Sequence, residues 1–469
     1  MKYKPTIGLE VHAELKTKSK MFCGCENNPH AAEHNQLVCP VCTAQPGALP
    51  VPNKTAIQYV LLFGNAVGAT TATFSEFDRK SYFYPDIPKA YQISQYEFPF
   101  LSGGTLSGID LTRVHLEEDT ARNQHGDDHS LVDFNRAGVP LMELVTEPVI
   151  HDAETAGKFA KELQLLLRTL NISDANMEKG EMRVEANISV SDTDELGVKV
   201  EVKNLNSFKS VEGAIAYEIE RQIALIEAGE AISQETRGWD EVKNKTFTQR
   251  TKETAKDYRY FPDPDIPKID TTSVAEFSKS SLSEITPELP SKTREIYTNL
   301  GLTSEVIEQI LSDSIINSIV KMILSEQKDI TSSTFKLVTN YLLTDVSPIL
   351  SSQAEYNSTE FPVVEYLKMV EMLESKTINS RTAKNILPLI LTEGINVQEY
   401  AEKHNLIQVQ DTEALEKIVD QIIQENESVV DEYKAGKETS IKFLVGQGMK
   451  LSKGTADPEL LLELIKAKI

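Results

Sequence analysis

The chain has 469 residues, of which 40% are hydrophobic and 25% are charged, and its formal net charge is −23. This length exceeds one ordinary core and indicates two to four domains, and the composition excludes a collagen-like or intrinsically disordered chain. No run of about 18 apolar residues occurs, so we expect no membrane span. The negative charge repels nucleic acid on average, so any RNA contact must come from local basic segments or from partner chains.

The N-terminal segment leads directly into a strand-like pattern. It has no basic start, no apolar segment and no small-residue cleavage site, so we expect no targeting signal and a cytoplasmic location. Over residues 6–14, apolar residues at every second position alternate with a polar face that holds Glu10 and His12. A period of two predicts a strand with these two side chains next to each other on one face.

All four cysteines of the chain lie within one short segment, as Cys23, Cys25, Cys39 and Cys42. The spacing is C-x-C and, thirteen residues later, C-x-x-C. Two close pairs on two turns can supply the four thiolates of a structural zinc site, which leaves no open position for chemistry. Disulfides and free thiols are the alternatives, but a cytosolic chain disfavours disulfides and unrelated thiols rarely gather in this way. We therefore predict a structural Zn²⁺ site.

Two amphipathic helices and a hairpin follow. Residues 153–170 and 211–228 carry apolar stripes at helical spacing, with Asp152 as the expected N-cap and Gly229 ending the second helix. Two strictly alternating segments, 182–190 and 198–203, predict an antiparallel hairpin. Its polar face gathers Arg183, Glu185, Asn187, Lys199, Glu201 and Lys203. For an isolated hairpin, a solvated face with cross-strand ion pairs is the more common explanation.

The order of elements predicts an α+β fold, because strands and helices mix without a regular βαβ rhythm. We expect a first domain at 1–290 with a mixed or antiparallel sheet, ending at the proline-rich segment TPELP. An all-α region follows, divided into a helical domain at 291–402 and a helical tail domain at 403–469. Neither a P-loop, a dinucleotide fingerprint nor an H-E-x-x-H motif occurs, so motif spacing alone does not predict nucleotide binding.

A basic segment lies in the tail, at residues 433–454. Its five lysines face a single acidic residue, Glu438, and they are Lys434, Lys437, Lys442, Lys450 and Lys453. Charge runs are usually solvated helix faces, and contact with tRNA is the alternative.

Long segments of the chain resemble the B subunit of the bacterial tRNA-dependent amidotransferase, the GatB family. The segments are GLEVHAEL (8–15), FCGC and CPVCTAQPGALPVPN (within 22–53), FDRKSYFYPDIPKAYQISQ (77–95), HLEED (115–119), SLVDFNRAGVPLMELVTEP (130–148), MEKGEMRVEANIS (177–189), EVKNLNSFKSV (201–211), ETRGWD (235–240), KDYRYFPDPDIP (256–267) and FLVGQGMKLSKG (443–454). Such long runs are far more specific than a short motif. The resemblance implies a cradle-like first domain and a tRNA-binding tail.

The resemblance also implies a chemistry. Glutamate on tRNA(Gln), aspartate on tRNA(Asn), or both, would be phosphorylated with ATP and Mg²⁺, because a carboxylate oxygen is too poor a leaving group for ammonia to displace. Ammonia from a glutaminase A subunit would then displace the phosphate. The implied partners are that A subunit and a small C subunit, in a heterotrimer, and mischarged tRNA, with neither DNA nor a membrane involved. No amidase-type signature occurs here, so the glutaminase must be another chain.

The same resemblance implies site residues. Glu10, His12 and Glu118 are the expected Mg²⁺ site, although strand parity places Glu117 rather than Glu118 on the polar face, and a bulge would be needed to reverse this. Histidine is an unusual Mg²⁺ ligand, so His12 can also act from outside the ligand shell. The expected catalytic cations, which suit phosphate oxygens, are Lys80, Arg183 and Lys203. ATP binding is expected from Lys80, Arg183, Glu185, Lys203 and Asn204.

Two departures from the family pattern and one competing hypothesis remain. The chain has TARNQHGDD after residue 119, where the family usually has small residues and a lysine, and it has Glu185 where an aspartate is usual.

The competing hypothesis is a non-catalytic, zinc-containing scaffold that binds tRNA. Burial of the charged strand faces would argue against it, because buried charges are costly for a scaffold. A relative specific for glutamyl-tRNA would need an inserted domain, for which this chain has no room.

Overall fold

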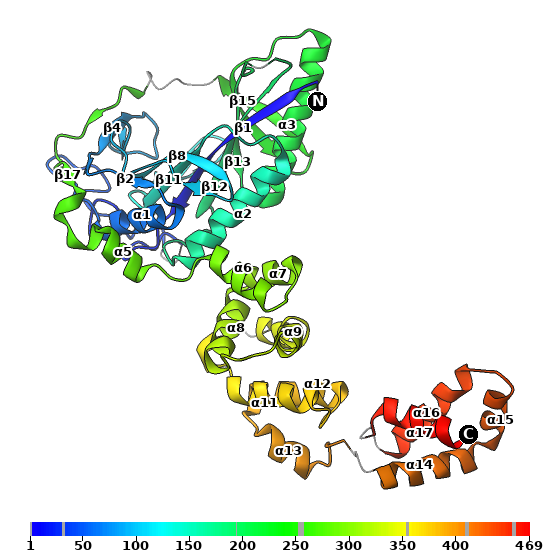
Figure 1. Cartoon of the computed structure of the whole chain (residues 1–469). Coiled ribbons are helices and arrows are strands. Elements are labelled where there is room, and N and C mark those ends of the chain that lie inside the picture. Colours follow the sequence, from blue (N-terminus) through cyan, green and yellow to red (C-terminus); the bar gives the residue numbers. More distant parts are fainter. Residues whose placement is uncertain are drawn as a thin grey trace. The chain divides into compact units, whose positions relative to one another are not determined.

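The computed structural model describes residues 2–30, 33–193, 195–251, 258–352, 356–408, 412–452 and 456–469. The chain forms two compact units, Met1–Lys292 and Thr293–Ile469 (Figure 1). The finer division at residues 290 and 402 remains a prediction. The α+β class is confirmed, since a large sheet with helices is followed by an all-helical unit. No helix among the described residues is long and apolar enough to cross a membrane.

A central sheet organises the first unit, and ten strands of the described chain belong to it. Its order is β15 (Lys245–Thr251), β14 (Glu235–Asp240), β13 (Val200–Leu205), β12 (Met182–Ser191), β1 (Lys4–Glu14), β11 (Pro140–Thr146), β8 (Ile109–Glu118), β6 (Leu101–Ser102) and β2 (Thr70–Thr71), with β7 (Thr105–Leu106) paired to β8. Neighbours are antiparallel except β13 and β14, so the sheet is mixed, as predicted. The predicted hairpin is the pair β12 and β13.

Smaller sheets and helices complete the first unit. The small sheets are β16 (Phe261–Pro262), β4 (Asp78–Ser81) and β5 (Tyr91–Ser94); β17 (Ile269–Asp270) and β3 (Phe74–Ser75); and β10 (Ser130–Asp133) and β9 (Arg122–His125). The helices are α1 (Lys54–Val67), α2 (Ala153–Thr169), α3 (Phe208–Ala228), η1 (Thr271–Ser273), η2 (Ala275–Phe277) and α5 (Lys279–Ile285). Asp152 caps α2 through a hydrogen bond from Thr155, and Gly229 ends α3 in a left-handed conformation, as predicted.

The apolar residues of the central strands face the helices. On β1, the side chains of Ile7, Leu9, Val11 and Ala13 are at most 1% exposed. They join one core with apolar side chains of α1, α2 and α3, and Figure 1 shows α2 and α3 beside β12 and β13. Because side chains alternate along a strand, this packing sends Glu10 and His12 to the opposite face, away from the core. The fold thus separates an apolar face from a polar one.

The second unit is helical throughout its described secondary structure. Its elements are α6 (Pro290–Asn299, beginning in the first unit), α7 (Ser304–Ser312), α8 (Ser314–Glu326), α9 (Ser332–Tyr341), η3 (Leu342–Val346), α10 (Ser347–Ser351), η4 (Ser358–Glu360), α11 (Val363–Glu374), α12 (Ser380–Glu393), α13 (Val397–Lys403), α14 (Thr412–Glu425), α15 (Glu427–Lys434), α16 (Thr439–Leu451) and α17 (Pro458–Lys468). The last four share a core that includes Leu415, Leu444 and Leu461.

Candidate active site

The four cysteines come together, as predicted. A backbone bond from Lys20 to Cys25 closes a tight loop around the first pair, and the Cys39 N–H donates to the Cys42 sulfur at 3.1 Å in the second. All four sulfurs lie within 4.8 Å of one another. The Cys39 and Cys42 sulfurs are 3.9 Å apart, close to the roughly 3.8 Å edge of a tetrahedron with a Zn–S bond of about 2.3 Å. The cluster can therefore hold a metal ion.

The four thiols do not all ionise by themselves. A hydrogen bond from Cys23 lowers the pKa of Cys42 to about 5, while burial raises the pKa of Cys25 to about 11. Four thiolates cannot coexist at this distance without a compensating cation, and a bound metal would supply that charge. The fully buried Lys20 ties the segment to the rest of the unit, since its Nζ donates to the Leu37 and Phe134 carbonyls at 2.7 and 3.2 Å.

A cavity of 480 Å³ lies on the polar face of the central sheet. Six strands of that sheet, together with β4 and the residues after β5, supply its largely polar wall. Its lining is Glu10, His12, Lys80, Gln95, Tyr96, Arg113, His115, Glu143, Glu185, Lys199, Glu201, Lys203, Gln234, Thr236, Tyr258 and Tyr260. The predicted residues Glu10, His12, Lys80, Glu185 and Lys203 thus share one cavity, although they are scattered along the sequence.

Two groups of acidic and histidine ligand atoms lie at this cavity, and all of their residues line it except Glu117, which is buried beside it. The first joins His12, Glu117 and Glu143, and the second joins Glu10, Glu185 and Glu201; within each group, the ligand atoms lie within 4.8 Å of one another. Strand register creates both groups, because His12 stands directly opposite Glu143 and Glu10 directly opposite Glu185. Hydrophobic packing on the other face fixes that register, since a slip by one residue would bury these charges in the core.

The first group is compact and buried. The His12 Nε2 lies 3.3 Å from a Glu143 oxygen and 3.8 Å from a Glu117 oxygen. His115, opposite Glu143 on β8, also approaches the Glu143 carboxylate at 3.3 Å. The carboxylates of Glu117 and Glu143 belong to residues that are 2% and 8% exposed, and Ser94 donates to Glu117 at 3.0 Å. The group is therefore held in place by its neighbours rather than by solvent.

The electrostatics show how strongly these groups interact. Burial opposes the charge of His12, yet Glu143 raises the pKa of His12 to about 9. Burial also opposes ionisation of Glu143, yet His115 and His12 hold the pKa of Glu143 well below its usual range. A ligating histidine must be neutral, so a bound cation would release the His12 proton and take over its role as counter-charge.

The second group carries less compensated negative charge. Burial, and then the carboxylates of Glu143, Glu185 and Glu201, raise the pKa of Glu10. Lys203 approaches Glu185 at 2.7 Å and Glu201 at 3.9 Å. Although burial opposes its charge, Glu185 raises the pKa of Lys203. Three converging carboxylates with one lysine are an oxygen-rich set that suits a hard cation such as Mg²⁺.

A β-bulge aims Lys203 at the second group. Where Val184 pairs with Leu205 and Ala186 with Val202, both Lys203 and Asn204 stand opposite the single residue Glu185. Asn204 adopts a left-handed conformation with φ of 62°, which asparagine tolerates better than most residues. The bulge leaves Asn204 exposed, whereas Lys203 reaches the carboxylates.

Three predicted residues lie elsewhere. Glu118 points to the opposite side of β8 from Glu117, where it forms a 2.6 Å ion pair with Lys89. Arg183 forms a 2.9 Å ion pair with Asp119 and is not part of the cavity lining. Asn204 also lies outside the lining. No bulge interrupts β8 at Glu117, so the geometry favours strand parity, and Glu117 rather than Glu118 joins His12.

Sequence reasoning missed Glu143 and did not select Glu201. Glu143 lies in the apolar run VPLMELV, where a lone carboxylate in a buried strand is a usable signal, because such a charge needs partners. The alternating pattern predicts Glu201 on the polar face of the hairpin, but nothing local separates it from a solvated residue. Lys80 was expected, and alternation along β4 explains its position: Arg79 pairs with Asp263, while Lys80 turns into the cavity over the Tyr258 ring.

Comparisons with known proteins agree with this architecture. Residues 5–275 match the model of the GatB/GatE catalytic domain, and residues 325–469 match that of the GatB domain. Relatives named as the B subunit of an aspartyl/glutamyl-tRNA(Asn/Gln) amidotransferase include those of Caldanaerobacter subterraneus subsp. tengcongensis (41% identical, all of both chains), Moorella thermoacetica (39%, all of both chains) and Gloeothece citriformis (41%, all of this chain and 98% of the relative).

The sheet with its charged cavity, together with a helical C-terminal unit, defines a catalytic subunit of the aminoacyl-tRNA amidotransferase class, an enzyme class of the ligase type. The family predicted from the sequence is confirmed. This chain belongs to the GatB family of aspartyl/glutamyl-tRNA(Asn/Gln) amidotransferase B subunits.

Proposed function

We propose that the 480 Å³ cavity is where the side-chain carboxylate of mischarged Glu-tRNA(Gln), Asp-tRNA(Asn) or both is phosphorylated by ATP and then converted to the amide. The observation that carries this proposal is the pair of acidic groups on one cavity wall, with lysines facing them. Phosphoryl transfer needs cations around spreading negative charge and close alignment of the reactants, and this arrangement suits both needs.

The acidic groups fit Mg²⁺. Glu117 and Glu143, with His12 as a ligand or a neighbour, would hold one ion, and Glu10, Glu185 and Glu201 would hold a second. When bound, Mg²⁺ would neutralise phosphate oxygens and orient them. The raised pKa of Glu10 supports the second site, because the excess negative charge responsible for it is what a divalent cation would relieve.

Three cationic side chains at the cavity would bind phosphate oxygens. Although burial opposes its charge, Glu117 raises the pKa of Lys80, so this lysine is cationic at neutral pH. Lys203 is held among the carboxylates of the second group. Within the described part of the chain, the buried Nε of Arg113 has no hydrogen-bond partner, and an anionic ligand would provide one. These residues replace Arg183 and Asn204 in the proposed ATP site.

The structural metal would be zinc, bound by Cys23, Cys25, Cys39 and Cys42, because four thiolates suit a soft, tetrahedral ion. The proposed partners are a glutaminase A subunit that supplies ammonia, a small C subunit and the mischarged tRNA, without DNA or membrane. The cytoplasmic location expected from the sequence remains a prediction.

The tail would contact tRNA through α16. Lys442 and Lys450 are both exposed on this helix, and Lys434 is exposed at the end of α15. Lys437 is already paired with Glu432 at 2.8 Å. Lys453 lies outside the described residues. Two lysines eight residues apart on one helix share a face, as a phosphate-binding surface requires.

The test is ATP hydrolysis by the complex purified with its partner subunits, with and without mischarged Glu-tRNA. Glu10→Gln, His12→Ala and Glu143→Gln are compared with Asp110→Asn, which removes an exposed carboxylate from β8 away from the cavity. We expect turnover that depends on mischarged tRNA and collapses in the three cavity variants but not in the control. Full turnover in all three would refute the proposed site and favour the scaffold hypothesis.

A further inference from the structure

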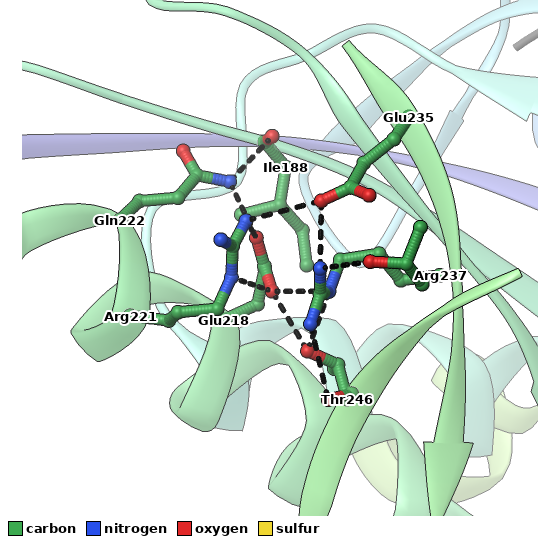
Figure 2. A network of polar contacts seen from close by, with 8 residues as sticks. Ile188, Glu218, Arg221, Gln222, Glu235, Arg237 and Thr246 are labelled. Atoms are coloured by element: carbon green, nitrogen blue, oxygen red, sulfur yellow. Dashed lines mark hydrogen bonds and ion pairs between the residues drawn. The ribbon is translucent and has the colours of Figure 1, made fainter. Parts of the chain in front are cut away.

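A second charged network lies on the side of β14 that faces away from the cavity. Figure 2 shows the Arg237 guanidinium of β14 pointing toward Glu218 of α3, between the helix and β15. Arg237 donates from Nε to the Thr246 hydroxyl at 2.8 Å and from Nη2 to the Thr246 carbonyl at 3.1 Å. Its Nη1 donates to Glu235 at 2.6 Å and to Thr248 at 2.9 Å. The planar fork of this side chain thus joins β14 to β15 at several points.

Glu218 is the buried centre of this network. Its side chain is fully buried, and one of its oxygens lies 3.6 Å from the Arg237 Nε. Arg221 donates to both of its oxygens, at 2.9 and 2.7 Å, and Thr246 and Gln222 donate at 3.1 and 2.9 Å. A buried carboxylate with this many donors holds its neighbours in one geometry, because any displacement leaves a charge unpaired.

The residue next to Arg237 faces the cavity. Side chains alternate along β14, so Thr236 points away from Glu218 and lines the cavity. It pairs directly with Glu201 across the parallel strands, and its hydroxyl donates to a Glu201 oxygen at 2.8 Å. Glu201 belongs to the second acidic group, with Glu10 and Glu185. Arg237, in the network on the helix side of β14, is therefore the sequence neighbour of Thr236, which bonds the Glu201 carboxylate on the cavity side.

The backbone pairing of β14 is irregular at this point. The pairing of β14 with β15 shifts between Thr236 and Arg237, because Gln249 is an extra residue opposite them. Towards the centre of the sheet, β14 is paired over only three residue pairs with β13. A bulge changes the local twist and the aim of a side chain. Side-chain bonds on the helix side therefore add to the backbone pairing that holds β14 in position next to Thr236.

We propose that Arg237, held by Glu218, is a positioning residue that sets β14 so that the Thr236 hydroxyl orients Glu201 in the second acidic group. This inference rests on the proposed function, in which that group holds a divalent cation. An apolar core could stabilise the α3 and β14 contact equally well. The directional fork of Arg237 fixes the position of the strand, which apolar contacts do less well.

The test measures cation affinity directly, with Mn²⁺ titrated into the full chain purified with its partner subunits and without ATP. The variants are Arg237→Lys, Thr236→Val and the double variant. Residues behind metal ligands typically contribute about 10–100-fold to metal affinity. We expect each single variant to weaken Mn²⁺ binding at the second acidic group by about tenfold. The double variant should be no weaker, because Arg237 acts through Thr236.

Gln222→Met is the matched control, because it removes another buried donor from Glu218, and the bonds of Gln222 run to Glu218 and to the Ile188 carbonyl of β12 rather than to β14. It should lower the unfolding temperature but leave Mn²⁺ affinity unchanged. The inference is wrong if Arg237→Lys lowers only the unfolding temperature, or if its effect on affinity adds to that of Thr236→Val. Glu10→Gln separates the two proposals: if it leaves two intact Mn²⁺ sites, the proposed function of the second group fails, whatever Arg237 does.

Discussion

The two metal-capable regions of this chain are built in opposite ways. The four cysteines lie within one short segment, and two local turns suffice to bring their sulfurs within 4.8 Å. The carboxylates of the cavity come from β1, β8, β11, β12 and β13, and the sheet alone makes them neighbours. The first region has soft ligands and a closed shell, which suits structure, whereas the second has hard ligands on a cavity, which suits chemistry. The local cysteine site can therefore contribute to folding of the unit, whereas the dispersed carboxylate sites form only after the sheet has folded.

The largest expected effect is at the cysteines. Cys39→Ser removes one of four thiolates, and a structural zinc site can contribute roughly 10–16 kcal/mol of apparent binding free energy. We expect the parent chain to carry zinc in elemental analysis, and the variant to lack it and to unfold in its first unit at a lower temperature. A variant that keeps full stability without zinc would contradict a structural role.

Glu143→Gln should reduce catalytic turnover and leave the zinc content unchanged, in contrast to Cys39→Ser. It keeps the shape of the side chain but removes the charge that His12 and His115 both approach at 3.3 Å. We expect ATP turnover dependent on mischarged tRNA to fall by about 100-fold or more, with zinc content unchanged. Asp110→Asn is the control, and equal losses in both variants would show that the effect is not specific to the cavity.

A smaller effect is expected in the tail. Lys442→Ala together with Lys450→Ala should weaken tRNA binding and reduce the slope of log affinity against log salt by about 1.5, at roughly 0.7–0.9 per phosphate contact. Lys437→Ala is the control, because this lysine is paired with Glu432. An unchanged slope in the double variant would leave α16 as a solvated helix.

The smallest effect is expected at the N-cap of α2, which belongs to neither metal region. Asp152→Ala should cost about 1 kcal/mol of stability, because the N–H of Thr155 loses its acceptor. That hydrogen bond lowers the pKa of Asp152. The stabilisation should therefore be complete above the unfolded pKa of about 3.9 and disappear as the pH falls through the lowered value. Asp152→Asn keeps an acceptor and should show little loss and no such pH dependence in thermal unfolding.

Much of the local structure was predictable because it depends on short-range patterns. Alternation identified β1 and the hairpin of β12 and β13, and helical spacing with a cap and a glycine identified α2 and α3. The resemblance added the family, which periodicity alone did not show. Strand parity predicts Glu117 on the polar face with His12, where the structure has it, whereas Glu118, which the resemblance favours, pairs with Lys89.

Local patterns and long family-like segments were enough to predict the family, the α+β class, the cysteine cluster and the polar face that holds Glu10 and His12. Only the tertiary structure showed that Glu143 and Glu201 complete the acidic groups, that Arg183 is paired with Asp119, and that Arg237 lies behind Thr236. The reason is physical: side-chain alternation and turns act over a few residues, whereas neighbours across strands are set by register. That register depends on packing of the whole apolar face.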